Sequence, residues 1–214
     1  MKWSLELIGP LREALKKPLP GEMARHVMAP PYRPQLSKEE IAERKPKMGA
    51  VLLLLYERQR ELHIILTQRK QYEGVHGGQM SFPGGKMDKT DANLVETALR
   101  ETREEIGVAP VGIEVIGQLS DLYIPPSNFL VHPVVGFAKV INGFKAQEDE
   151  VDKIVEIPLS FFGDDKNINT KTEIKLYNGM VVTVPAYVFG NYIIWGATAI
   201  MLSEFIYIVK GIEQ

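Results

Sequence analysis

Cysteine is missing from this chain of 214 residues. Its absence excludes disulfides, thiolate zinc sites, iron–sulfur ligation and a cysteine nucleophile, so a bound metal must be held by carboxylate, carbonyl or imidazole groups. A chain without disulfides fits a reducing compartment, and we expect it in the cytoplasm.

An excess of either charge is missing too. The chain has 25 Lys and Arg against 27 Asp and Glu, for a net charge of −2. This balance argues against a protein that binds nucleic acid through a general basic surface, although it leaves small anions open as ligands.

The sequence also has no apolar run long enough for a membrane span. The most apolar stretch, Tyr192–Val209, is interrupted by Ser203 and Glu204 before it reaches the roughly 18–20 residues that crossing a bilayer requires. We expect a buried strand that runs into a core helix. No long apolar stretch follows Lys2, so neither a signal peptide nor a membrane partner is expected.

Residues 1–47 differ from the rest, because prolines divide them into short segments and they carry a net charge of +4. The segments Ser4–Lys17 and Ser37–Lys45 are predicted to be helices. We expect a helical extension over 1–47 that packs on a main domain over 48–214. The extension can cover the substrate site, form a homodimer contact or extend the core.

From Gly49 onward the pattern changes to strand-like runs bounded by glycine, proline or charge. The predicted strands are Ala50–Tyr56, Leu62–Gln68, Ile113–Leu119, Pro133–Val140 and Lys175–Val184. Helices are predicted over Asp91–Ile106, with Thr90 or Asp91 as cap and Gly107 as stop, and over Gly196–Val209. Helices that fall between strands indicate an α/β sandwich.

The helix predicted over Asp91–Ile106 carries an unusual acidic face. Glu101, Glu104 and Glu105 fall within about 100° of arc, next to the apolar stripe. Like charges at this spacing repel, and at a helix C-terminus each also meets an unfavourable dipole. Such an arrangement favours a function over a purely structural role.

Just upstream, Ser81–Lys86 is predicted to be a loop, and its paired glycines Gly84 and Gly85 let backbone carbonyls approach a ligand closely. Carboxylates with a nearby carbonyl suit a hard divalent cation, and Mg²⁺ or Mn²⁺ commonly completes its shell with substrate phosphate and water. The residues therefore predict a divalent metal and a polyphosphate together.

The segment from Gly85 to Val108 resembles the signature box of the Nudix hydrolase family, Gly-x5-Glu-x7-Arg-Glu-U-x-Glu-Glu-x-Gly-U, where U is bulky and apolar. The positions that match in register are Arg100, Glu101, Glu104, Glu105, Gly107 and Val108, with Thr102 at the first U. The first half is one residue longer than the pattern, and Asp91 stands where the first box glutamate is counted from Gly85. The resemblance implies a Nudix-type α/β/α sandwich with a mixed β-sheet and a loop–helix–loop metal site.

The same resemblance implies residue roles. Glu101 and Glu105 become the principal ligands of Mg²⁺ or Mn²⁺, Glu104 a direct or water-mediated ligand, and the Gly85 carbonyl a contributor. Arg100 is expected to orient a box glutamate through a charge-assisted hydrogen bond.

The implied reaction is attack of water on one phosphorus of a diphosphate. Two sources of the general base stay open: Glu101 or Glu104 in the box, and a distal carboxylate within Glu148–Glu150.

Phe82–Asp91 and Ala98–Glu101 are similar to the coenzyme A pyrophosphatase branch of the family. That branch also has an upstream element, which Ile65–Gly85 follows with Lys70 in place of a serine and Gly74 in place of an arginine. This similarity implies hydrolysis of coenzyme A or its derivatives to adenosine 3′,5′-bisphosphate and 4′-phosphopantetheine. Arg69, Lys70 and Gly84 are the expected substrate contacts.

The departures at Lys70 and Gly74 keep a second substrate class open, another nucleoside diphosphate compound such as a dinucleotide or a nucleotide sugar. A non-catalytic Nudix-like ligand sensor is a third hypothesis, and the retained arginine and glutamates of the box argue against it. Four aromatic side chains are candidate contacts to adenine or pantetheine, with core packing as the alternative: Tyr123, Phe129, Tyr187 and Trp195.

Overall fold

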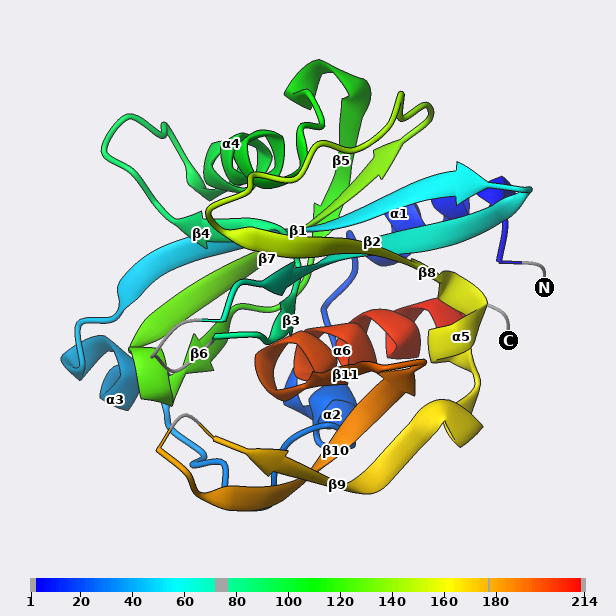
Figure 1. Cartoon of the computed structure of the whole chain (residues 1–214). Coiled ribbons are helices and arrows are strands. Elements are labelled where there is room, and N and C mark those ends of the chain that lie inside the picture. Colours follow the sequence, from blue (N-terminus) through cyan, green and yellow to red (C-terminus); the bar gives the residue numbers. More distant parts are fainter. Residues whose placement is uncertain (1–2, 72–76, 177, 213–214) are drawn as a thin grey trace.

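The computed structural model describes residues 3–71, 77–176 and 178–212 (Figure 1). The described strands are β1 (Lys47–Arg58), β2 (Glu61–Arg69), β3 (Met80–Ser81), β4 (Gly84–Lys86), β5 (Ile113–Gln118), β6 (Leu122–Ile124), β7 (Phe129–Ala138), β8 (Val151–Pro158), β9 (Ile168–Lys175), β10 (Val181–Phe189) and β11 (Tyr192–Trp195). The α-helices are α1 (Ile8–Ala14), α2 (Glu22–Arg25), α3 (Lys38–Glu43), α4 (Leu94–Ile106), α5 (Leu159–Gly163) and α6 (Gly196–Ile212), and short 3-10 turns cover Leu5–Leu7, Pro110–Gly112, Pro125–Ser127 and Asp165–Asn167.

Among the described residues, β1 to β8 form one mixed sheet and β9 to β11 form a second sheet, in the order β11-β10-β9. In the first sheet the path β3-β2-β1-β7-β5 is extended by β4 on β1, β6 on β7 and β8 on β2. The pair β1–β7 is parallel, with Lys47 opposite Phe129, whereas β1 runs antiparallel to both β2 and β4.

The leucine run of β1 is buried on both faces of this sheet. Leu52 and Leu54 belong to the core cluster that α4 covers, and Leu53 and Leu55 belong to the larger cluster that contains α6. Because successive side chains of a strand point to opposite faces, a continuous apolar run is what a central strand between two helical layers requires.

The two helical layers lie on opposite sides of the sheet (Figure 1). The helix α4 packs on β1 and β4, and α6 packs on the other face with α1, α2 and α5. The structure confirms the predicted α/β/α sandwich with a mixed sheet. No helix in the described part of the chain is both long and apolar enough to cross a membrane.

Most predicted elements form, with shifted ends. Strands β1, β2, β5 and β7 and the passage from β11 into α6 lie where the sequence predicts them. The single strand predicted over Lys175–Val184 is wrong, because β9 ends at Lys175 and β10 begins at Val181. A turn that contains Asn178 and Gly179, the latter with φ of 83°, joins them, and Asn-Gly is a turn dipeptide of β-hairpins.

Residues of the predicted N-terminal extension lie in the same core as the rest. Leu7, Leu11 and Met28 are fully buried in the cluster that contains α6. A buried ion pair adds to this packing: Arg25 donates from Nε to Glu204 Oε2 over 2.9 Å, and the Glu204 side chain has no exposed surface. The charge that interrupts the apolar run of α6 is therefore neutralised from α2.

Candidate metal centre

The helix α4 is held in place by capping at both ends. The Asn93 side chain accepts a hydrogen bond from the Glu96 amide, and Gly107 ends the helix with φ of 76°. The prediction that Thr90 or Asp91 caps the helix is wrong. Asp91 is engaged elsewhere, since its carboxylate accepts bonds from Asp88 N, Thr97 Oγ1 and Arg100.

One face of α4 packs on the sheet and carries a carboxylate into it. Thr97, Ala98, Thr102 and Ile106 are buried there, and Glu105 is buried with them at 3% exposure. The glutamates of the acidic face are graded in exposure: the Glu105 side chain is 4% exposed, that of Glu101 15% and that of Glu104 48%. The acidic face therefore reaches from the core into solvent.

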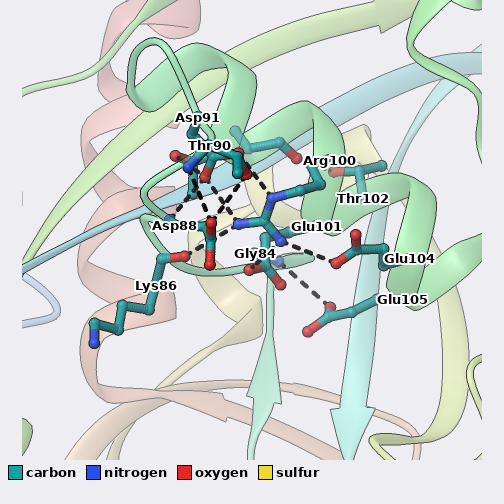
Figure 2. Close-up of polar contacts among 12 residues, drawn as sticks. Gly84, Lys86, Asp88, Thr90, Asp91, Arg100, Glu101, Thr102, Glu104 and Glu105 are labelled. Atoms are coloured by element: carbon teal, nitrogen blue, oxygen red, sulfur yellow. Dashed lines mark hydrogen bonds and ion pairs between the residues drawn. The ribbon is translucent and has the colours of Figure 1, made fainter.

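Arg100 lies at the centre of these carboxylates (Figure 2). Its Nε and Nη2 donate to the two oxygens of Asp91 at 2.8 and 2.9 Å. Its Nη1 donates to Glu101 and to Glu104, each at 2.9 Å. Hydrogen bonding to Asp91, then to the glutamates, raises the pKa of the guanidinium, and the same bonds hold the pKa of Asp91 well below its usual range.

Glu105 is placed differently, because it has little to balance its charge. The Gly84 amide donates to its Oε2 over 3.4 Å, and Arg69 Nη1 lies 4.0 Å from its Oε1. Burial raises the pKa of Glu105 to about 7, and the charges of Glu101 and Glu150 add to the rise. A buried carboxylate in a negative environment is a favourable place for a bound cation.

Burial also raises the pKa of Glu101, and Glu104 and Glu150 contribute to that rise while Arg100 opposes it. Glu150 thus acts electrostatically on both Glu101 and Glu105. Of the predicted distal carboxylates, this one is close enough to the box glutamates to influence their ionisation.

The two glycines form β4, not the loop that the sequence suggested, and they bring the backbone against the carboxylates. A side chain at Gly85 would place its Cβ 2.6 Å from the Glu101 carboxyl carbon. Gly84 has φ of 152°, and a Cβ there would lie 2.4 Å from the carbonyl oxygen of Ala50. Only glycine fits at these two positions without displacing β1 or Glu101.

The predicted substrate contacts lie at the end of β2 and the start of β4. Arg69 points toward Glu105, and its Nε is buried without a hydrogen-bond partner among the described residues. Lys70 is exposed, and its backbone amide donates to the Glu150 carbonyl. Gly84 meets Glu105. Gly74, one of the departures noted above, lies outside the described residues.

The carboxylates do not form a preformed ligand set. In the residues that the structure describes, no three carboxylate or imidazole side chains converge as they would around a metal. Arg100 holds Glu101 and Glu104, whereas Glu105 is turned toward Gly84. The donor chemistry still suits a hard cation: three carboxylates lie within about one turn of α4, and one is buried with a raised pKa.

Comparison with known proteins bears on what such a site does. A family model described as the NUDIX domain matches residues 46–166. The chain belongs to the Nudix family. Proteins described as uncharacterized Nudix hydrolase NudL, from Salmonella paratyphi B and Salmonella newport, are 35% identical over 176 residues, which cover 80% of this chain and 86% of theirs.

Solved structures include the NUDIX domain of Shewanella oneidensis NrtR complexed with ADP ribose, with 20% identity, a TM-score of 0.45 and coverage of 65% of this chain and 84% of that one. A MutT/nudix family protein from Enterococcus faecalis has 18% identity, a TM-score of 0.48 and coverage of 83% and 65%. The family match and the NudL relatives carry the assignment: this protein is a Nudix hydrolase.

The sequence alone does not identify one part of the site and one buried charge. The sequence favours Asp91 as a helix cap, although its place in the Nudix box also marks it as a partner for another box residue. Glu204 stands out in the sequence only as an interruption of an apolar run. A carboxylate in an otherwise apolar helix requires a buried partner of opposite charge. The position of Glu204 therefore predicts a cationic side chain from another part of the chain beside it.

Proposed function

We propose that this Nudix hydrolase is a divalent-metal-dependent pyrophosphatase that hydrolyses coenzyme A or its derivatives to adenosine 3′,5′-bisphosphate and 4′-phosphopantetheine. The observation that carries the catalytic part is the graded set of glutamates on α4, with the buried Glu105 at its inner end. The substrate is supported by the branch-like sequence around Phe82–Gly85 and Ala98–Glu101.

Glu101 and Glu105 are the proposed ligands of Mg²⁺ or Mn²⁺, with Glu104 and the Gly85 carbonyl as further donors. Divalent cations at such a site neutralise the diphosphate oxygens and lower the pKa of bound water. Arg100 positions Glu101 and Glu104 through the bonds that it also makes to Asp91. Its role in this proposal is to orient ligands.

Substrate is bound by cations and backbone at the end of β2. Arg69 and Lys70 contact the phosphates, and the Gly84 backbone lies against the substrate. A water molecule attacks one phosphorus, the bond from that phosphorus to the bridging oxygen breaks, and a carboxylate accepts the proton of the water. Glu101 and Glu104 are candidate bases, and the influence of Glu150 on both Glu101 and Glu105 makes it the third.

A second substrate class is motivated by Lys70 and Gly74, where the coenzyme A branch has serine and arginine. Purified protein with Mg²⁺ or Mn²⁺ should be incubated with coenzyme A, acetyl coenzyme A, a dinucleoside polyphosphate, ADP-ribose and a nucleotide sugar. The proposal predicts that coenzyme A or its acyl derivative gives the highest kcat/KM. Rapid turnover of another compound without turnover of coenzyme A would reject the substrate, and no turnover of any would favour a ligand sensor.

A further inference from the structure

A cavity of about 410 Å³ lies between the end of β2 and the second sheet, outside the carboxylate cluster. Its described lining includes Gln68 of β2, Gln79 and Met80 beside it, and Asn191 and Trp195 at or near β11. The volume falls in the range of small-molecule sites. None of the box glutamates lines it, so it is a separate feature of the molecule.

One wall of the cavity is aromatic and partly exposed. Trp195 and Ile193 lie on one face of β11, and Ile194 between them is buried in the core, so these two side chains point away from that core. Trp195 is half-buried, whereas Tyr187, another of the four aromatic candidates, is 2% exposed and packs in the core. Trp195 therefore presents part of its indole to the cavity.

The remaining wall is rich in amides. Gln68 and Asn191 line it, and an amide carries both a donor and an acceptor. Among the described residues of the lining, Lys175 is the one charged side chain. An aromatic face, an amide edge and a cation together suit a nucleobase whose sugar bears a phosphate.

The cavity adjoins the carboxylate cluster through β2. Gln68 lines the cavity, and the next residue, Arg69, lies 4.0 Å from Glu105. In the pairing of β2 with β3, Gln68 lies opposite Met80. Four residues after Met80, the Gly84 amide donates a hydrogen bond to Glu105. The cavity and the cluster thus lie at the same end of β2, reached by consecutive residues of that strand.

We propose that this cavity binds the nucleobase end of the substrate, with the base stacked on Trp195, its polar edge hydrogen-bonded to Gln68 and Asn191, and a sugar phosphate near Lys175. The proposal rests on the proposed function for the identity of the substrate. It also names the residues that set the orientation of an asymmetric diphosphate, with its nucleobase end toward the second sheet.

The test uses Trp195 as the reporter. The chain has two tryptophans, so the Trp3→Phe variant leaves Trp195 as its single indole. Titration with adenosine 5′-monophosphate should quench this fluorescence saturably, and 4′-phosphopantetheine should not. Gln68→Met should weaken the binding of the monophosphate about tenfold, the expected loss for one or two hydrogen bonds. The matched change Gln118→Met, at an exposed position of β5, should leave it unchanged.

Absence of quenching by the monophosphate, quenching by 4′-phosphopantetheine in its place, or equal effects of the two glutamine variants would overturn the proposal. If Trp3→Phe does not fold, the signal that wild type shows and Trp195→Phe loses gives the same comparison. The monophosphate has no diphosphate bond, so the binding result is independent of catalysis. Quenching without turnover of any diphosphate rejects the function and keeps the cavity, and turnover without quenching rejects the cavity.

Discussion

Arg100 forms a bidentate ion pair with Asp91, in which Nε donates to Oδ1 at 2.8 Å and Nη2 donates to Oδ2 at 2.9 Å. The same guanidinium bonds Glu101 and Glu104, so one side chain ties the loop before α4 to the proposed metal ligands. Asp91 stands at the position of the first box glutamate in a segment one residue longer than the pattern. The pair shows how the longer loop still delivers a carboxylate to the arginine.

Loss of this pair should impair catalysis more than folding. Asp91→Asn removes the negative charge that orients Arg100, and we expect kcat to fall about 10- to 100-fold, the usual effect of losing a partner of a metal ligand. The melting temperature should fall by a few °C. Asp165→Asn, which breaks an exposed pair with Lys210, is the control and should change neither. Equal kcat for wild type and Asp91→Asn would show that the pair does not position the ligands.

Glu105 should make the stability of the metal-free protein depend on pH. Its pKa is raised from 4.5 to about 7 by burial, so the folded state holds this proton more tightly than the unfolded state. The resulting stabilisation is complete below pH 4.5 and is lost as the pH rises through 7. At about 1.4 kcal/mol per pH unit between pH 4.5 and about 7, the loss is at most about 3–4 kcal/mol.

Urea unfolding at several pH values between 4.5 and 8 measures this effect. The stability of Glu105→Gln should lack the decline that wild type shows over the window, whereas Glu104→Gln, at an exposed position, should keep it. Mg²⁺ added at pH 8 should recover stability in wild type and not in Glu105→Gln. Parallel curves for wild type and Glu105→Gln would contradict the assignment.

The close approach of β4 to α4 should make Gly85 intolerant of a side chain. A Cβ there would lie 2.6 Å from both the Glu101 carboxyl carbon and its Oε2. Because the far end of a side chain can move, Gly85→Ala should fold but displace Glu101, and we expect at least a tenfold loss of kcat. Gly112→Ala, at a site with no atom within 4 Å, should retain wild-type kcat. Equal kcat values for Gly85→Ala and wild type would show that the position of Glu101 does not matter for catalysis.

The buried pair of Arg25 and Glu204 should make the N-terminal segment essential to stability. Arg25→Met leaves the fully buried Glu204 carboxylate without its guanidinium partner, and we expect a loss of about 3–5 kcal/mol in the free energy of unfolding. The double change Arg25→Met with Glu204→Leu should recover much of that loss, since no unpaired charge remains. A double variant as unstable as Arg25→Met would contradict this account.

The sequence predicts the helix of the box and its acidic face well, because periodicity and register are local properties. The arc of Glu101, Glu104 and Glu105 follows from helix geometry alone, and the apolar run Ala50–Tyr56 is enough to predict a strand. The interplay of Arg100 with Asp91 is not local in this sense. It depends on the conformation of the seven residues between β4 and α4. The spacing of the box shows that this loop is one residue longer than the pattern, but it does not determine how the loop folds.

Long-range relations account for what the sequence could not predict. The exposure of Trp195 and the burial of Tyr187 depend on which face of a hairpin meets α6, and both are aromatic residues in strand-like runs. The short strands β3, β4 and β6 consist of two or three residues, too few to show an alternating pattern, and they form because longer neighbours offer unpaired backbone groups.

The most direct test of the metal centre is a parallel measurement of Mn²⁺ binding and diphosphate hydrolysis in wild type and Glu105→Gln. Electron paramagnetic resonance of free Mn²⁺ gives the affinity, and the preferred substrate of the panel gives kcat. The account predicts Mn²⁺ affinity at least tenfold weaker in the variant, the scale of losing a charged ligand, with a parallel fall in hydrolysis. Unchanged binding and unchanged hydrolysis in Glu105→Gln would contradict the account.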